Sequence, residues 1–179
     1  MLARTHIMSA VSLTVPLLTT MPIEVHFSFV TAVVLGSLFP DLDEKGSFLS
    51  RRVYVVSLLI SQFTEHRGIT HTLLALPIYF FIAFVVMHLG GASLFFSTII
   101  ALGFMIGCLI HLLMDSATRS GVAIFLPFSK KRYYILSKSY RVFTGGKLEK
   151  FAILPLFSFI AAIEMFIYLS GLQYTGNLQ

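Results

Sequence analysis

Six apolar segments separated by turns dominate the hydropathy pattern of this chain. They cover residues 7–20, 23–39, 53–63, 72–88, 94–114 and 151–172. A helix rises about 1.5 Å per residue and a bilayer core is about 30 Å thick, so the segments 94–114 and 151–172 are long enough to span it. The segment 72–88 approaches that length. The segments 7–20 and 23–39 predict shorter embedded helices, and 53–63 predicts a short interfacial helix.

The polar stretch between the last two apolar segments carries a different pattern. Between Tyr133 and Thr144 polar and apolar residues alternate, and Gly145 and Gly146 follow. Alternation bounded by glycine is typical of paired strands. We therefore predict a small β-hairpin in this loop.

Composition supports a membrane protein. Of the 179 residues, 56% are hydrophobic and 12% are charged, whereas a soluble domain has about 25% charged residues. The mean hydropathy is +0.87. The length favours a single domain over residues 1–179. We expect an all-α fold, a polytopic bundle of about four to five membrane-embedded helices plus the short interfacial helix.

The turns between the apolar segments fix a topology. Turns at 21–22 and 90–91 and the tail after 172 fall on one side, and all other connections fall on the opposite side. Every lysine and arginine maps to that opposite side: Arg4, Lys45, Arg51, Arg52, Arg67, Arg119, Lys130, Lys131, Arg132, Lys138, Arg141, Lys147 and Lys150. The positive-inside rule makes this side cytoplasmic and predicts a multi-pass protein of the cell (inner) membrane.

The net charge of +5 has two interpretations. Contact of the basic loop with anionic lipid headgroups accounts for it, and we favour membrane lipid as the partner. Nucleic-acid binding stays open as the alternative, because Tyr133, Tyr134 and Tyr140 could stack on bases.

Arg4 before an apolar stretch also resembles a secretory signal peptide. No small-x-small cleavage site stands out before Glu24, and cleavage would remove His6. We therefore expect this segment to be retained.

Histidine and aspartate residues gather at the segment ends on the basic side. Imidazoles and carboxylates are ligands of zinc and similar ions. The candidates are His6, Asp41, Asp43, His66, His71, His111 and Asp115. His111 and Asp115 are four residues apart, so they share one helix face. His66 and His71 flank Gly68, which can break a helix and let both imidazoles turn inward.

These motifs also have non-ligand interpretations. The His66–His71 turn could be an interfacial turn in which Arg67 binds phosphate, and Asp41 and Asp43 could lie in a solvated turn. If one of these two carboxylates is a ligand, the other could orient a ligand, accept a proton or bind a second ion.

Taken together, the motifs resemble a known family. Those that carry the resemblance are Thr5-His6, Gly36-x-Leu38-x-Pro40-Asp41-x-Asp43, His66-Arg67-Gly68-x-Thr70-His71, His111-Leu112-x-x-Asp115 and Thr144-Gly145-Gly146 with Glu149. They resemble the LexA-regulated, membrane-bound metal-dependent hydrolase family (YdjM-like). The order of the ligands is also similar to that of zinc-dependent phospholipases C and single-strand nucleases.

The resemblance implies a ligand set and an activity. It implies His6, Asp41, His71, His111 and Asp115 as ligands of one or two divalent ions, most simply zinc, with Asp115 able to bridge two ions. We include His66 as a further candidate ligand. The expected function is hydrolysis of a phosphoester, such as a phospholipid, at the cytoplasmic face. Asp43 would take the proton and Arg67 would bind phosphate.

The alternative is a non-catalytic membrane protein with a structural or transported metal ion. Transport is disfavoured, because the candidate ligands stop near one membrane surface and leave no polar path to the other.

Overall fold

The computed structural model describes residues 1–44, 46–55, 57–58 and 68–176, with the backbone alone over 172–176. The elements, in chain order, are α1 (Ala3–Thr14), the 3₁₀ helices η1 (Val15–Thr20) and η2 (Ile23–Val25), α2 (His26–Leu38), the 3₁₀ helices η3 (Pro40–Asp43) and η4 (Ile69–His71), α4 (Ala75–Leu89), α5 (Leu94–Ser116), the 3₁₀ helix η5 (Lys138–Tyr140), the π-helix η6 (Glu149–Ile153) and α6 (Leu154–Gly176). The described residues form no strand, so the all-α prediction is confirmed.

Within the described residues, three helical stretches are long and apolar enough to cross a membrane: Ile23–Asp43, Leu94–Ser116 and Glu149–Gly171. The helix α4 has 15 residues, which is about 22 Å of helix and shorter than the bilayer core. The helix α1 ends at Thr14 and continues as 3₁₀ helix, since Pro16 lacks the amide hydrogen that a longer α-helix requires. The short helix predicted over 53–63 lies largely outside the described residues.

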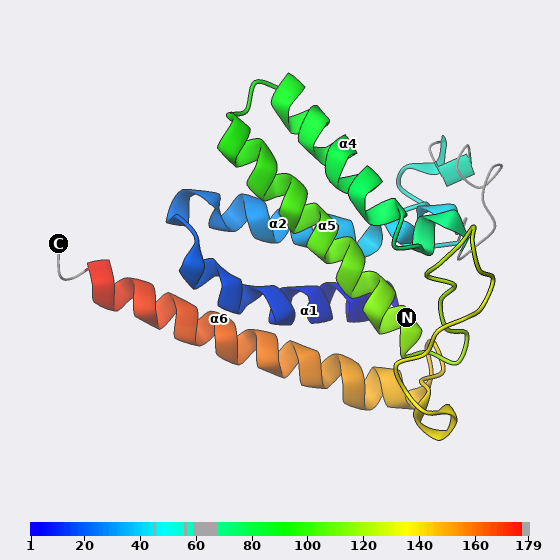
Figure 1. Cartoon of the computed structure of the whole chain (residues 1–179). Coiled ribbons are helices and arrows are strands. Elements are labelled where there is room, and N and C mark those ends of the chain that lie inside the picture. Colours follow the sequence, from blue (N-terminus) through cyan, green and yellow to red (C-terminus); the bar gives the residue numbers. More distant parts are fainter. Residues whose placement is uncertain (45, 56, 59–67, 177–179) are drawn as a thin grey trace.

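The helix α5 occupies the centre of the bundle. It packs against α1, α2 and α4, while α6 runs along α1 at the edge (Figure 1). Glycines bring α2 and α5 close together, because a Cβ atom at Gly107 would overlap the carbonyl oxygen of Val33, and one at Gly36 would overlap that of Phe104. Small residues allow this approach in membrane helix pairs.

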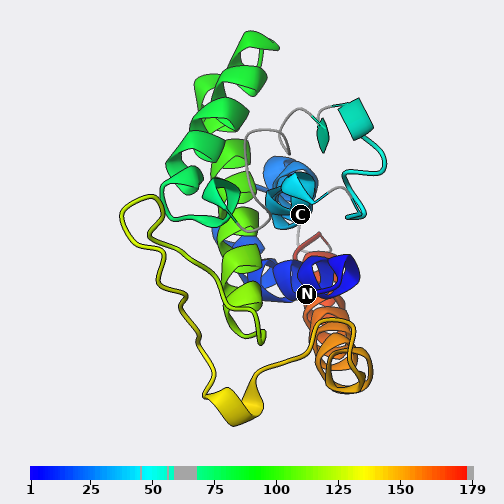
Figure 2. The ribbon, with the colours of Figure 1, turned by 90° about the vertical axis from the view of Figure 1, so that its right-hand side faces the viewer.

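The two ends of the bundle differ. One end carries the N-terminus, the end of α5, the segments after α2 and before α4, and the loop 117–148 (Figure 1). Figure 2 looks onto this end, which we call the ligand end. The opposite end carries the α1–α2 and α4–α5 turns and the C-terminus.

The loop 117–148 holds two isolated β-bridges in place of the predicted hairpin. Val122 pairs with Tyr133, and Thr118 pairs with Val142. The amide of Tyr133 donates to Val122 (2.8 Å) and that of Val142 to Ala117 (3.0 Å). The hairpin over 133–144 is therefore wrong: both of its halves pair with the chain that follows α5 and not with each other.

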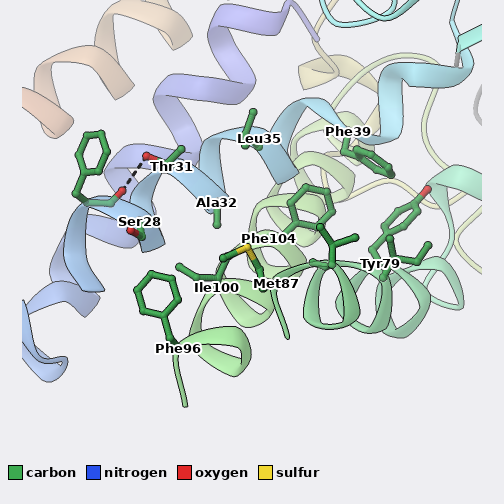
Figure 3. Close-up of a pocket in the computed structure, with 14 residues that line it drawn as sticks. Ser28, Thr31, Ala32, Leu35, Phe39, Tyr79, Met87, Phe96, Ile100 and Phe104 are labelled. Atoms are coloured by element: carbon green, nitrogen blue, oxygen red, sulfur yellow. Dashed lines mark hydrogen bonds between the residues drawn. The ribbon is translucent and has the colours of Figure 1, made fainter. Parts of the chain in front are cut away.

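The outer surface of the helices suits lipid. Large side chains such as Phe81, Phe151 and Phe166 are exposed. An apolar groove of about 430 Å³ lies between α2, α4 and α5, and Phe39 and Tyr79 close it toward the ligand end (Figure 3). The Tyr79 hydroxyl donates to the carbonyl of Thr70 (3.0 Å), so this end of the groove adjoins the turn that holds His71.

Candidate metal centre

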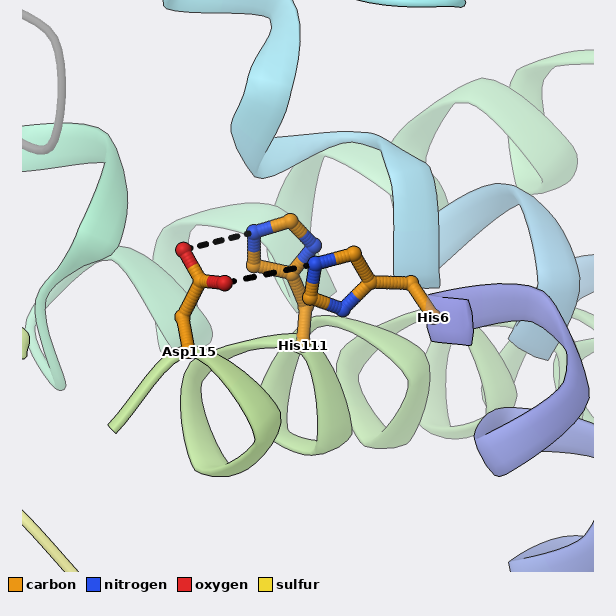
Figure 4. Close-up of side chains that lie close together, drawn as sticks. All are labelled: His6, His111 and Asp115. Atoms are coloured by element: carbon orange, nitrogen blue, oxygen red, sulfur yellow. Dashed lines mark ion pairs between the residues drawn. The ribbon is translucent and has the colours of Figure 1, made fainter. Parts of the chain in front are cut away.

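The first group of ligand atoms joins α1 to the end of α5. His6, His111 and Asp115 are buried, and the rings of the two histidines stack with centroids 3.8 Å apart and planes at 12° (Figure 4). His6 Nε2 lies 3.4 Å from Asp115 Oδ1, and His111 Nε2 lies 3.9 Å from Asp115 Oδ2. The i, i+4 spacing in α5 aims His111 and Asp115 at the same point, as the sequence predicts.

The second group adds the two 3₁₀ turns and shares His111. Asp41 lies in η3, where Pro40 ends α2, and His71 lies in η4, before α4 begins. His111 Nε2 is 3.2 Å from His71 Nε2 and 3.5 Å from Asp41 Oδ1, and the latter two atoms are 3.7 Å apart. Five of the predicted ligands thus converge: His6, Asp41, His71, His111 and Asp115.

The spacing of these atoms fits a metal ion. Bonds of 2.0–2.2 Å to a tetrahedral ion place its ligand atoms roughly 3.3–3.6 Å from each other, close to the distances within the second group. The burial of His6 adds a second argument: within the described part of the chain neither of its ring nitrogens has a hydrogen-bond partner. Buried polar atoms are normally satisfied, and coordination would satisfy one of these nitrogens.

Hydrogen bonds orient two of the imidazoles. His111 Nδ1 donates to the carbonyl of Ser37 in α2 (2.7 Å), which leaves the Nε2 lone pair directed at both groups. His71 Nδ1 faces Asp43 Oδ2 at 3.3 Å, and the Thr70 hydroxyl also donates to Asp43. Asp43 therefore lies next to Nδ1 of His71, opposite the Nε2 atom that faces the second group, and can orient this imidazole.

Two predicted residues fall outside the described part of the chain, and the two histidines that were not predicted as ligands lie away from both groups. His66 and Arg67 are outside the described residues, so their roles stay predictions. His26 bonds to Tyr168 and to the carbonyl of Met21 (2.9 Å), and the exposed His88 stacks on Phe84, both outside the two ligand groups.

Sequence reasoning missed the groups that hold α1 in place. The carboxylate of buried Glu149 accepts from the amides of Leu2 and Gly145, both at 2.6 Å, and the Met1 amino group pairs with Asp115. Gly145 has a φ of +73°, which glycine adopts at little cost. The Thr-Gly-Gly motif followed by Glu149 was the available signal for this contact, which fixes the helix that carries His6.

Comparison with known proteins places this arrangement in a family. The family model for the YdjM inner membrane protein matches residues 1–173. The chain belongs to this family. Inner membrane protein YdjM of Escherichia coli (strain K12) is 34% identical to it over 130 residues, which are 72% of this chain and 62% of that protein, and the Shigella flexneri protein of the same name matches equally.

A more distant relative is the uncharacterized protein YvsG of Bacillus subtilis (strain 168). It is 31% identical over 93 residues, which are 52% of this chain and 53% of that protein. The matched part covers less than two thirds of each of these relatives. No solved structure matches the chain. The predicted membership of a YdjM-like family is thus confirmed, together with a membrane location. Regulation by LexA, metal-dependent hydrolase activity and the likeness to phospholipases C and nucleases stay predictions.

Metal binding at the second group should depend on pH. Burial disfavours the His71 imidazolium, but the carboxylates of Asp41 and Asp43 outweigh burial and raise its pKa from 6.5 to about 9. Below that pH an ion must displace a proton from His71. We expect the apparent zinc affinity to rise about tenfold per unit between about pH 7 and pH 8.5, measured by competition with a chelating dye. An affinity independent of pH in this range would contradict the role of His71 as a ligand.

Proposed function

We propose that this protein is a membrane-bound, metal-dependent hydrolase that acts on a phosphoester at the cytoplasmic membrane face. The observation that carries the proposal is the exposure of Asp41. Its side chain is 17% exposed and lines a large cavity, whereas His71, His111 and Asp115 are at most 1% exposed. Catalytic zinc keeps an open coordination position, while structural zinc is closed by protein ligands. Protein therefore encloses the candidate ligands except at Asp41, whose side chain faces the cavity.

The chemistry of the donors favours zinc, which takes imidazole and carboxylate ligands. When bound, such an ion supplies Lewis acidity and lowers the pKa of a coordinated water toward ~7. The residues that would hold the ion are His6, His111 and Asp115 from α1 and α5, and Asp41 and His71 from the two turns. Asp43 keeps His71 in place from behind.

The cytoplasmic placement rests on the topology expected from the sequence, in which every lysine and arginine falls on the same side as the candidate ligands. A phospholipid substrate is supported by the apolar groove, whose end at Phe39 and Tyr79 adjoins the turns that carry Asp41 and His71. We propose that Arg67 assists in binding phosphate, as its place beside the His71 turn in the sequence indicates.

The purified full chain in detergent tests this function. It is incubated with bis(p-nitrophenyl) phosphate and, separately, with mixed-lipid vesicles, after metal loading and after treatment with a chelator. We expect hydrolysis that the chelator abolishes and zinc restores. Turnover that persists after complete metal removal would refute the mechanism. Stoichiometric metal with no turnover of either substrate would favour the alternative, a non-catalytic protein with a structural or transported ion.

A further inference from the structure

A cavity of about 1090 Å³ opens beside the metal centre at the ligand end. Its walls come from the start of α1, from the segment after α2 and from the loop after α5. We call it the arginine cavity, because Arg4, Arg51, Arg52 and Arg132 line it. Asp41 lines it too, so a molecule bound in this cavity lies next to the second ligand group.

Local contacts hold three of the four guanidinium groups. Arg51 Nε donates to the carbonyl of Gly46 (3.1 Å), and Arg132 Nη1 donates to that of Ser120 (2.9 Å). The Arg52 guanidinium lies 4.0 Å above the ring of Phe48. Each guanidinium has five N–H donors, so these contacts fix its direction and leave further donors for a ligand.

The charge of the cavity calls for an anion. Among the described residues, the acidic side chains that line it are Asp41 and Glu44, so the described lining has four basic and two acidic side chains. All four arginines are exposed, so water and salt screen their mutual repulsion, and the excess of positive charge in the described lining favours an anion. A phosphate group carries about −1.5 to −2 charges at neutral pH and matches the guanidinium fork in shape.

Lipid contact alone does not explain this arrangement. Arginines that serve the positive-inside rule need only lie near the headgroups. These four come from three separate stretches of the chain, since Arg51 and Arg52 are adjacent, and they line one cavity beside a candidate metal ligand. Arg141 illustrates the ordinary case, since it stacks 3.4 Å over Tyr134 and does not line the cavity.

We propose that the arginine cavity binds the phosphate groups of a substrate with two linked phosphates, held beside the metal centre. The role of the bound molecule as a substrate rests on the proposed function, but its binding requires neither the metal ion nor hydrolysis. The volume exceeds that of one phosphate group, and four forks provide partners for the oxygens of two.

Binding of inorganic pyrophosphate to the metal-depleted full chain tests the proposal. The protein is placed in phosphatidylcholine nanodiscs and titrated by calorimetry. We expect saturable binding that weakens at least about tenfold in the double variant Arg51→Gln/Arg132→Gln, since each loses charge-assisted hydrogen bonds. The matched control Lys138→Gln/Arg141→Gln loses the same charge outside the cavity and should bind as the wild type does. Absence of binding, or equal weakening in the control, would overturn the proposal.

A second titration separates the two sources of the phosphate. A short-chain alkyl diphosphate, which carries two linked phosphates on an apolar tail, is compared with pyrophosphate on the same proteins. Tighter binding of the alkyl diphosphate, lost in the Arg51→Gln/Arg132→Gln variant, would identify a lipid headgroup, and tighter binding of pyrophosphate would identify a free phosphate compound. If phosphatidylglycerol nanodiscs displace pyrophosphate equally from the wild type and from both variants, the arginines make only general contacts with lipid headgroups. This result would overturn the proposal. Binding in these titrations, together with no hydrolysis by the metal-loaded protein in the assay described above, would refute the proposed function and leave the cavity's role intact.

Discussion

Replacement of His111 by alanine is expected to lower the metal affinity of the protein by more than about 100-fold, since the loss of groups that merely orient a ligand already costs about 10–100-fold. His111 belongs to both ligand groups, and its Nε2 atom lies within 4 Å of donor atoms on Asp41, His71 and Asp115. The variant also removes the bond to the Ser37 carbonyl, which helps α2 to hold η3 and Asp41 in place.

The affinity loss is tested by the metal content of the purified variant. It is measured by mass spectrometry after dialysis against buffered zinc. His88→Ala is the matched control, because His88 is exposed and lies outside both ligand groups. Thermal unfolding with chelator present shows whether the His111→Ala variant folds. If it does not, Asp41→Asn, at a partly exposed position, carries the test with an expected loss of at least about tenfold. Wild-type metal content in a folded His111→Ala protein would disprove the centre.

Replacement of Gly107 by alanine is expected to destabilise the protein by about 1–3 kcal/mol, the usual cost of inserting a methyl group into a close-packed contact. The new Cβ atom would overlap the Val33 carbonyl, so α2 and α5 would have to separate. Gly107 lies one turn before His111 on the same face of α5. Separation would therefore lengthen the bond from His111 to Ser37 and weaken metal binding as well as folding.

Gly171→Ala in α6 is the control, because a Cβ atom there meets nothing within 4 Å and alanine is the better helix former. Thermal unfolding in detergent and zinc titration are measured on both variants. The expected pattern is a lower melting temperature and weaker zinc binding for Gly107→Ala alone. A melting temperature unchanged by Gly107→Ala would show that the two helices do not pack as described.

The fold was largely predictable because apolar length identifies membrane helices without knowledge of their partners. The prediction of a hairpin was wrong because the backbone amides of Tyr133 and Val142 form hydrogen bonds with the chain that follows α5. The local alternation of polar and apolar residues carries no information about these long-range partners. The convergence of the candidate ligands was predictable because each stands where an apolar segment ends. The contacts of Ser37 and Glu149 were not, since each depends on how two distant helices pack.

The shared imidazole also sets the stoichiometry of the centre. A ring nitrogen has one lone pair, and the other nitrogen of His111 is bound to the Ser37 carbonyl. An ion that takes His111 together with Asp41 and His71 therefore removes it from the first group, where His6 and Asp115 remain. Two protein ligands are fewer than the three that catalytic zinc sites keep. Titration of the protein with zinc should thus saturate a tight site at one equivalent, and any second ion should bind far more weakly and leave first on dilution.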